Sequence, residues 1–446
     1  MTAYIAPGPK GSFLLGSLRD LQRDPLAFFE HVQREYGGIA RLRLGPRRAY
    51  LVSDPEYVRE VLVSQARIVP KTNFIREQLG RFLGNGILTN EGDSHRRQRR
   101  LVQPAFNHQK IARYAGSMVT LTAKMLDGWK VGHSYDIDEE MMHLTMEIIA
   151  ETAFGTEVDG VFQRVADAIA VLQAISIIEF KAGYMLPEWV PTANNRRRKK
   201  AAKVMSDTVL TFIRERRASG EERDDLLSML LQAQDEDDGS VMTDEQVRDE
   251  AVTLFAAGHE TTSNAMTWTW YLLAQHPQVE AALHEELDRV LGDRPPTLAD
   301  LRDLPYTEMV VKEALRLYPP AWLLMSRTPS EPLTLGGVAI KPGEWIFVAP
   351  WVIHRNPDQF PDPARFDPGR FAPGEEDQRP RYAYLPFGGG PHVCIGNGFA
   401  MMEARLILAT VAQRYRLALD PGQTVVPEPE ITLRPRYGMH MTVQAR

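Results

Sequence analysis

Phe387-Gly-Gly-Gly-Pro-His-Val-Cys-Ile-Gly396 contains the only cysteine of this 446-residue chain, Cys394. Apolar residues between Ala400 and Val411 follow it with the spacing of a helix face that packs on a core. A cysteine ahead of a helix is readily deprotonated, because the helix dipole and the unpaired backbone N–H groups stabilise its thiolate. Thiolates bind metal ions, so the pattern predicts that Cys394 is a metal ligand at the base of a long buried helix.

The residue types around the cysteine support this interpretation. Three consecutive glycines, 388–390, allow the tight or left-handed turns that bring backbone amides round to the sulfur, where such donors tune a metal's redox potential. Gly396 leaves room for a close neighbour, and Phe387 is expected to exclude water. Two alternatives stay open. A lone cysteine is most often a small buried apolar residue, and it can also be a hydrolase nucleophile, although no residue is identifiable as its base.

The loop resembles the haem-ligand loop of the cytochrome P-450 superfamily, Phe-x-x-Gly-x-[Arg/His]-x-Cys-x-Gly. The defined positions are matched by Phe387, Gly390, His392, Cys394 and Gly396. The resemblance implies haem b as the cofactor, with Cys394 as the axial ligand of the iron and with Phe387, His392 and Gly396 next to the haem. His392 stands where arginine is commoner, so its contact with a haem propionate involves either a neutral or a protonated imidazole.

A second motif, Glu313-Ala-Leu-Arg316, lies in a predicted helix that ends at Pro319-Pro320. Its two charged residues share one helix face, and from spacing alone they would form a solvated surface pair. The motif resembles the Glu-x-x-Arg motif of the same family, in which a downstream arginine joins the pair. Arg370, within Phe366–Phe371, matches that arginine. The resemblance implies a structural triad that locks the loops near the cysteine.

The longest predicted helix runs from about Asp244 to His276. Thr243 and Gln246 form a capping box at its start, and Pro277 is expected to stop it. Near its middle stands Ala257-Gly-His-Glu-Thr-Thr262, where a glycine and two β-branched hydroxyl residues weaken helical hydrogen bonding. This stretch is either a local weakness that neighbours pack against, or a groove with a function.

The same stretch resembles the family's [Ala/Gly]-Gly-x-[Asp/Glu]-Thr motif. In the family, the acid and the alcohol deliver protons and hold water at the dioxygen site. The resemblance implies that Glu260 and Thr261 have these roles and that Ala257 lies at the cofactor.

A fourth motif, His95-Arg-Arg-Gln-Arg99, is similar to the family's His-x-x-x-Arg segment. Because His95 and Arg99 share one helix face, both can contact haem propionates, as the resemblance implies. Arg327 matches a further propionate-binding arginine of the family, whereas His354 is either another such contact or a local capping residue. The neighbouring arginines form either a solvated helix face or a docking site for an acidic electron-donor protein; they are Arg96, Arg97 and Arg100.

The composition is that of an ordinary globular enzyme, with 43% hydrophobic and 25% charged residues. The 52 basic and 58 acidic residues give a net charge of −6, which argues against a general nucleic-acid binder. A single cysteine cannot form an internal disulfide, which suits the reducing cytoplasm. The N-terminal segment lacks a long apolar span and a signal pattern. We therefore expect a cytoplasmic protein without a membrane span, of the soluble bacterial type.

The pattern along the chain predicts a mainly α fold with small β-sheets. A hairpin is expected over 39–53, followed by a short helix that Asp54 and Pro55 begin. Helical patterns dominate 107–318, and short strands return between 333 and 349. The acidic stretch Gln234–Ser240 is interpreted as a solvated loop, and the basic run Asn195–Lys200 as a polar helix face. We expect one domain over 1–446 with the cytochrome P-450 fold, in which the haem lies between the long central helix and the helix after the cysteine loop.

The resemblance implies a haem-thiolate monooxygenase that inserts one oxygen atom of O2 into a lipophilic substrate by hydroxylation or epoxidation. No flavin or iron–sulfur module fits within this length, and one cysteine cannot hold a cluster. Electrons are therefore expected from separate partners, a ferredoxin or flavodoxin with an NAD(P)H-dependent reductase.

The apolar segments that match the family's pocket suit a fatty acid, a terpenoid or a steroid-like molecule, although such stripes are also typical of ordinary core. Residues 181–189 are either a lid or a packed loop. The predicted pocket residues are Phe74, Phe82, Leu88, Phe255, Leu324 and Met439.

Two further classes compete with the monooxygenase. A peroxide-using or rearranging haem-thiolate enzyme would keep Cys394 but would not need the Glu260–Thr261 pair, so the presence of this pair argues against it. A non-catalytic haem sensor or carrier would tolerate the loss of Thr261 and would need no reductase.

Overall fold

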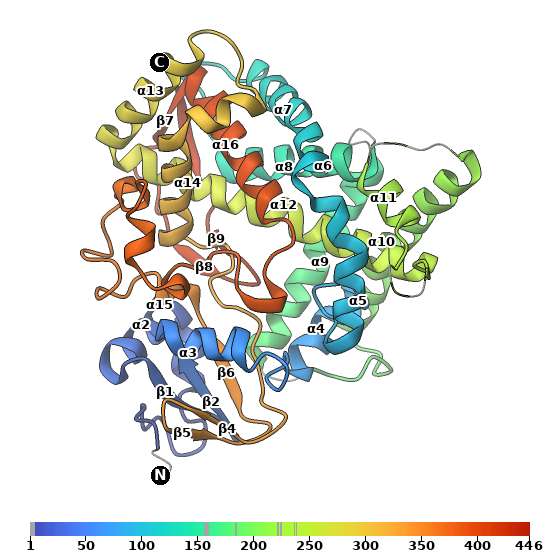
Figure 1. Ribbon diagram of the computed structural model, residues 1–446, viewed down its shortest axis with the longest axis vertical. Coiled ribbons are helices and arrows are strands. Elements are labelled where there is room, and N and C mark those ends of the chain that lie inside the picture. Colours follow the sequence, from blue (N-terminus) through green and yellow to red (C-terminus); the bar gives the residue numbers. More distant parts are fainter. Residues whose placement is uncertain are drawn as a thin grey trace. The chain divides into compact units, whose positions relative to one another are not determined.

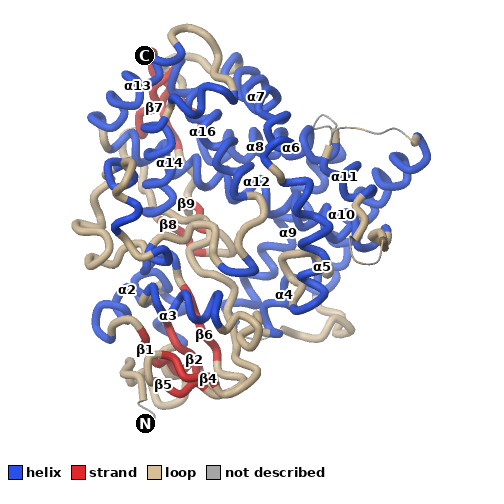
Figure 2. Tube along the Cα trace, viewed as in Figure 1, coloured by secondary structure: helices blue, strands red, loops and turns tan. Residues whose placement is uncertain are grey.

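The computed structural model describes residues 5–155, 160–182, 185–220, 223, 225–235, 237 and 239–446 (Figure 1). The predicted fold class is confirmed, because helices predominate and the strands form only small sheets (Figure 2). The chain divides into two compact units. A β-rich unit consists of residues 1–75, 309–394 and 427–434, and a helical unit consists of 76–308, 395–426 and 435–446. The single-domain prediction stays a prediction.

The β-rich unit is built on a three-stranded sheet of order β1-β2-β6. The predicted hairpin is confirmed, since β1 pairs antiparallel with β2, and β6 adds in parallel to β2. Asp54 accepts a hydrogen bond from the backbone N–H of Glu56 at 2.9 Å, so the predicted cap of the short helix α3 is present. The elements that lie wholly within this unit are α1 (Leu18–Arg23), α2 (Pro25–Tyr36), β1 (Ile39–Leu44), β2 (Arg47–Val52), α3 (Pro55–Arg59), β4 (Leu333–Leu335), β5 (Val338–Ile340), β6 (Trp345–Val348), α15 (Pro350–Ile353) and β8 (Pro427–Pro429).

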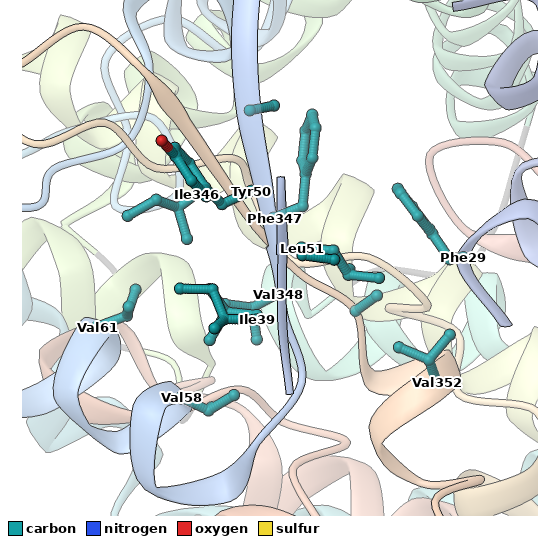
Figure 3. Close-up of a cluster of buried hydrophobic side chains, with 14 of the residues drawn as sticks. Phe29, Ile39, Tyr50, Leu51, Val58, Val61, Ile346, Phe347, Val348 and Val352 are labelled. Carbon is teal, nitrogen blue, oxygen red and sulfur yellow. The ribbon is translucent and has the colours of Figure 1, made fainter. Parts of the chain in front are cut away.

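The core of the β-rich unit lies where α2 and α15 pack beside this sheet (Figure 3). Phe29 of α2 and Phe347 of β6 place their ring centroids 6.0 Å apart, and Leu51 and Val352 are fully buried in the same cluster. Burying a large apolar side chain contributes about 1.5–3 kcal/mol, so this cluster gives the unit a stable base for the loops that it carries.

The helical unit contains most of the long helices and the sheet of order β3-β10-β7. Its elements are α5 (Gly92–Val102), α6 (His108–Ile111), α7 (Ala115–Asp127), β3 (Ser134–Asp136), α8 (Ile137–Phe154), α9 (Gly160–Ala182), α10 (Ala193–Ser219), α11 (Leu226–Gln232), α12 (Asp244–Gln275), α13 (Pro277–Leu291), α16 (Asn397–Arg414), β7 (Tyr415–Leu419) and β10 (His440–Ala445). Three elements cross the boundary between the units, namely α4 (Asn73–Leu83), α14 (Pro305–Leu317) and β9 (Leu433–Pro435).

The long predicted helix is α12. It begins with the predicted capping box, in which Thr243 accepts from the backbone N–H of Gln246 at 3.2 Å and Gln246 accepts from the backbone N–H of Thr243 at 3.0 Å. The helix ends at Gln275, one residue earlier than predicted, and Pro277 begins α13. Among the described residues, none of the helices combines the length and the apolar character that crossing a membrane requires.

Candidate active site

The cysteine loop is a closed turn in the β-rich unit. The backbone N–H of Gly388 donates to the carbonyl of Leu385 at 3.0 Å, and the N–H of Cys394 donates to the carbonyl of Phe387 at 2.9 Å. Gly388 and Gly390 have φ angles of +70° and +66°, the left-handed conformation that glycine adopts without strain. The side chain of Cys394 is exposed at the end of this turn. The loop therefore holds one accessible thiol in a fixed place.

Close packing is a second reason why position 390 requires glycine. A Cβ atom at this position would overlap the carbonyl oxygen of Leu62, which lies in the helical turn Glu60–Ser64. At Gly389, a Cβ would lie 2.6 Å from the ring of Tyr382. The loop is thus packed directly on the backbone of its own unit, which limits how far the cysteine can move.

Cys394 also stands just before α16. Gly396 is the N-cap residue of this helix, and its carbonyl accepts from the backbone N–H of Ala400 at 2.9 Å. Within the helical unit, a Cβ at Gly396 would lie 3.9 Å from the ring of Phe106. A sulfur two residues ahead of an N-cap is in the region where the helix dipole favours a thiolate.

The Glu-x-x-Arg pair is a buried, bidentate ion pair and not a surface pair. Arg316 donates from Nε to Oε2 of Glu313 at 2.6 Å and from Nη2 to Oε1 at 2.8 Å, and both side chains are 0% exposed. Arg370 approaches the same carboxylate, with Nε 3.4 Å from Oε1 of Glu313. The structure therefore brings together the three residues that the sequence analysis combined in a triad.

Arg316 uses its remaining N–H groups to fasten a long loop. These groups donate to backbone carbonyls of His354 at 2.9 Å, Pro363 at 2.8 Å and Arg365 at 3.1 Å. With the two bonds to Glu313, each of the five N–H donors of the guanidinium has an acceptor. A planar guanidinium suits this work because it can hold a carboxylate and several carbonyls at once.

The middle of α12 is open on the face that Ala257 and Thr261 share, one helical turn apart. Between Glu250 and Trp270 every residue is buried except Ala256, Ala257, Gly258 and Thr261. The hydroxyl of Thr261 donates to the carbonyl of Ala257 at 2.8 Å, one turn earlier on this face. Such a bond loosens the helix locally. The structure thus leaves the predicted alcohol accessible on a helix whose other central residues are packed.

Glu260 lies beside this face and is buried. Its carboxylate accepts a hydrogen bond from the side-chain amide of Gln173 on α9. On the neighbouring His259, Nδ1 lies 2.8 Å from the carbonyl of Phe255 and donates to it, and burial lowers the pKa of this imidazole, so the ring is neutral. Gln173 is a site residue that sequence reasoning missed, because it is 87 positions away from Glu260.

Glu403 is a second residue that the motifs did not identify. It is buried on α16 and accepts a hydrogen bond from the side chain of Thr262, the residue after Thr261. Burial raises the pKa of Glu403 to about 8. The available signal was one acidic residue within the mainly apolar stretch between Ala400 and Val411, since buried carboxyls are rare without a special reason.

His95 and Arg99 lie on α5, His95 buried and Arg99 half-buried. The interpretation of the neighbouring arginines is partly wrong. Arg97 and Arg100 form ion pairs with Asp235, at 3.2 Å and 3.1 Å, and the side chain of Asp235 is 1% exposed.

The stretch 234–240 is therefore not simply a solvated loop, because Asp235 gains two arginine partners that lie far away in sequence. Glu236 and Asp238 of this stretch lie outside the described residues. Arg96 pairs with Asp93 on the exposed side of α5, as a solvated face would. The basic run 195–200 is a polar, exposed helix face except at Asn195 and Arg198, which are buried, and Arg198 pairs with Glu179.

The remaining haem-contact candidates lie in the β-rich unit. Arg327 is buried, and its backbone exchanges two hydrogen bonds with Ile346 of β6, at 2.9 Å and 2.8 Å. His392 is half-buried in the cysteine loop. His354 is fully buried, and its ring bonds to the backbone of other segments of this unit.

The predicted pocket residues differ in their surroundings. Phe255 and Met439 are buried in the helical unit, and the ring of Phe255 packs 6.1 Å from that of Phe154. Phe74 packs on Trp345 at 5.7 Å. Three others are half-buried, namely Phe82, Leu88 and Leu324.

The segment 181–189 shows features of both a lid and a packed loop. Arg81 donates to the carbonyl of Leu186 at 3.0 Å, while the side chain of Trp189 is 80% exposed. Tyr184 of this segment lies outside the described residues.

The residues fit a haem with a thiolate ligand. The donor that the chain offers is an exposed sulfur on a rigid turn, and the open face of α12 carries a hydroxyl but no bulky side chain. A prosthetic group with one protein ligand needs such an accessible donor, whereas a closed structural metal site would gather several.

Comparisons with known proteins agree with this geometry. A protein-family model described as Cytochrome P450 matches residues 6–442. Cyclooctatin synthase from Streptomyces melanosporofaciens is 40% identical over 437 residues, which cover 96% of this chain and 93% of that protein. Cyclooctat-9-en-7-ol 5-monooxygenase from the same organism is 40% identical, covering 95% and 91%.

Two further comparisons extend this similarity. Pentalenene oxygenase from Streptomyces avermitilis is 34% identical, covering 95% of this chain and 93% of that protein. A crystal structure of the cytochrome P450DA heme domain superposes with a TM-score of 0.90 at 26% identity, covering 100% of this chain and 99% of that one.

Proposed function

This chain belongs to the cytochrome P450 family. We propose that Cys394 is the thiolate ligand of the haem iron and that the substrate of the enzyme is a terpenoid. As a member of this family, the protein is a haem-thiolate monooxygenase that inserts one oxygen atom of O2 into a lipophilic substrate. When bound, the haem activates dioxygen, and a thiolate ligand donates electron density that favours O–O cleavage. The observation that supports the role of Cys394 most directly is its exposed sulfur on a closed glycine turn ahead of α16.

In this proposal Glu260 and Thr261 supply and position protons. The hydroxyl of Thr261 donates its hydrogen bond to the carbonyl of Ala257. Its oxygen can therefore accept a hydrogen bond from a water molecule on the open face of α12. Glu260 is buried and accepts a hydrogen bond from Gln173, which fixes its carboxyl group next to Thr261 in the chain. The pair can therefore pass protons from a buried acid to an accessible hydroxyl.

The charged and aromatic residues around the loop and on α5 hold the cofactor in this proposal. His95, Arg99, Arg327 and His392 would supply donors for the two propionates, and arginine suits a carboxylate because it can bind bidentately. Phe387, Gly396 and Ala257 would pack against the porphyrin. Glu313, Arg316 and Arg370 do not touch the cofactor; they keep the loop segments in place.

The proposal of a terpenoid substrate comes from the relatives. Their names state a cyclooctat-9-en-7-ol monooxygenase and a pentalenene oxygenase, and this chain is similar to them over nearly its whole length. An apolar lining suits such a molecule. The proposed lining of the substrate pocket consists of Phe74, Phe82, Leu88, Phe255, Leu324 and Met439.

Members of the family take electrons from redox partners. We propose a ferredoxin or a flavodoxin with an NAD(P)H-dependent reductase as the partners here, because the single cysteine cannot hold an iron–sulfur cluster. The cytoplasmic location of the protein remains a prediction from the composition and from the single cysteine.

The absorption spectrum of the reduced protein with carbon monoxide tests the ligand. A Soret band shifted far to the red is expected for the wild type and should be lost in Cys394→Ser. A wild-type band of the histidine-ligated type would reject Cys394 as the ligand.

Turnover tests the substrate. Terpene hydrocarbons and terpene alcohols, fatty acids and steroids are screened for the high-spin shift of the haem and then incubated with NADPH, a surrogate ferredoxin and a reductase under labelled dioxygen. We expect one labelled oxygen atom in a terpenoid product. Turnover of fatty acids alone would reject the terpenoid proposal, and binding without turnover of any compound would favour a carrier.

A further inference from the structure

The imidazole of His354 connects two parts of the β-rich unit that are distant in sequence. Its Nε2 accepts a hydrogen bond from the backbone N–H of Leu385 at 2.9 Å. Its Nδ1 lies 3.3 Å from the carbonyl oxygen of Arg316, near the C-terminus of α14. The ring is fully buried and packs on Tyr384, with a centroid distance of 5.2 Å. His354 therefore links the helix of the Glu313–Arg316 pair to the segment that leads into the cysteine loop.

These contacts define the chemical state of the ring. Nε2 accepts from an N–H group, so it carries no proton, and Nδ1 must be the protonated nitrogen that donates to Arg316. Burial and the nearby guanidinium groups of Arg316 and Arg355 lower the pKa of His354 to about 3. The imidazole is thus neutral at physiological pH. Since both ring nitrogens are bonded to the backbone, the expectation of a propionate contact is wrong, whereas a capping role is partly right.

The bond to Leu385 reaches the cysteine through a short series of backbone contacts. The carbonyl of Leu385 accepts from Gly388, which begins the glycine turn. The carbonyl of Phe387, two residues after Leu385, accepts from the N–H of Cys394 at 2.9 Å. The entry and the exit of the loop are therefore fixed against each other, and His354 provides the side-chain contact at the entry.

We propose that His354 is a positioning residue that anchors the entry of the cysteine loop and so keeps Cys394 in place for thiolate ligation. The inference rests on the proposed role of Cys394. A displaced loop would lengthen the bond between the sulfur and the metal. It would also favour protonation of the Cys394 thiolate to a thiol, which is a weaker ligand.

Three substitutions separate the two hydrogen bonds of the ring. His354→Phe keeps much of the volume and removes both bonds. His354→Gln places an amide oxygen where Nε2 lies and can still accept from Leu385. His354→Asn places an amide N–H where Nδ1 lies and can still donate to Arg316, but it does not reach Leu385. A role in loop anchoring predicts that glutamine rescues the function and asparagine does not.

The chain offers a matched control in His276→Phe. The ring of His276 also lies 2.8 Å through Nδ1 from a backbone carbonyl, that of Leu272, but it is in the helical unit at the end of α12. Loss of this bond should weaken the protein without changing the cysteine loop.

The test uses the purified holoenzymes, reduced under carbon monoxide. The measured quantity is the rate at which the red-shifted thiolate band converts to the band of the thiol form, together with the reduction potential and the melting temperature. We expect His354→Phe and His354→Asn to convert about tenfold faster than the wild type, because both lose the hydrogen bond to Leu385 and one such bond contributes about a factor of ten. His354→Gln should stay within about threefold, and His276→Phe should match the wild type.

Other results would overturn the inference. If His354→Phe converts no faster than His276→Phe, the loop is held by other contacts. If the conversion rates of the variants correlate only with their melting temperatures, and His354→Asn and His354→Gln convert at the same rate, His354 has a general structural role. Should the phenylalanine variant fail to fold, the asparagine–glutamine comparison decides. A wild type without a thiolate band would reject the proposed function of Cys394 as well, which distinguishes that failure from the failure of His354 alone.

Discussion

The side chain of Glu250 on α12 accepts a hydrogen bond from the backbone N–H of Ile87 at 3.0 Å, and the adjacent Asp249 accepts from the N–H of Asn85 at 2.8 Å. Two carboxylates thereby hold the loop that precedes Leu88, one of the proposed pocket residues. Gly86 lies so close to α12 that a Cβ there would overlap the hydroxyl of Thr253. The long helix thus positions a loop of the proposed pocket as well as the acid and the alcohol.

The stability of this attachment should depend on pH. Burial raises the pKa of Glu250 to about 7, above the value of 4.5 that is usual for the unfolded chain. Between these values the native state binds more protons than the unfolded state. The stability that the protonated form of Glu250 provides is therefore complete below pH 4.5 and is lost as the pH rises through 7. Glu250→Gln, which keeps the acceptor oxygen, should therefore stabilise the protein by up to about 3 kcal/mol at pH 8 and by almost nothing at pH 4.

Denaturant unfolding of Glu250→Gln and the wild type at several pH values measures this difference. Glu245→Gln is the control, because Glu245 is exposed in the first turn of the same helix. A stabilisation that does not change with pH would show that Glu250 is not the titrating group.

Removal of Glu313 should be severely destabilising. Glu313→Ala leaves the buried guanidinium of Arg316 without its carboxylate, which costs roughly 3–5 kcal/mol. Glu35→Ala breaks the exposed pair with Arg34 and should cost less than about 1 kcal/mol. Chemical unfolding of both variants gives the comparison, and equal effects would contradict a structural role for the buried triad.

The close packing of Gly390 gives a prediction for the cysteine loop. Gly390→Ala and Gly374→Ala both place a side chain at a positive φ angle, +66° and +87°, which costs about 1–2 kcal/mol in each case. Only at Gly390 does the new methyl group also overlap the backbone of Leu62, since a Cβ at Gly374 meets no atom within 4 Å. Gly390→Ala should therefore lose haem or its thiolate ligation.

The haem content and the carbon monoxide spectrum of the two glycine variants test this expectation. Gly374→Ala should keep both close to the wild-type values. If the two variants bind haem equally well, the contact with Leu62 does not restrict the loop.

Thr261 should affect the coupling of electron use to product formation. Thr261→Ala removes the hydroxyl on the open face of α12, so we expect NADPH consumption to continue while oxygen is lost as peroxide or water. Thr261→Ser should restore most of the coupling. Thr269→Ala is the control, because its hydroxyl makes the same bond one turn back, to Ala265 at 2.7 Å, but is buried.

The ratio of product to NADPH measures the coupling, and the peroxide yield accounts for the difference. A Thr261→Ala variant that remains tightly coupled would remove the proton-delivery role from this residue. If Thr269→Ala lowers the ratio of product to NADPH as much as Thr261→Ala does, the effect comes from a change in the helix and not from loss of the Thr261 hydroxyl.

Local features of the fold were predictable because neighbouring residues determine them. The capping box of Thr243 and Gln246 and the cap at Asp54 depend on groups within three positions of each other. The hairpin of β1 and β2 follows from alternation and a short turn. The cysteine loop was recognisable for the same reason, since its function needs a contiguous set of glycines around one sulfur.

Contacts between distant segments were not predictable in this way. Gln173 meets Glu260 from 87 positions away, and Arg100 meets Asp235 from 135 positions away. Spacing alone assigned Arg97 and Arg100 to a solvated face, because a helical pattern shows which side chains share a face but not what covers it. The burial of Glu313 and Arg316 could be expected only from the family resemblance.

The amino-acid sequence alone singled out the sulfur that we propose as the metal ligand and the helix with the acid and the alcohol, and through the family resemblance it indicated the class of reaction. These depend on residue types at short spacings, where covalent geometry sets the distance. Tertiary structure alone decided which buried polar groups support them: Gln173 at Glu260, Glu403 at Thr262 and His354 at the loop entry. A buried polar group must find a partner, and only packing brings distant segments close enough to provide one.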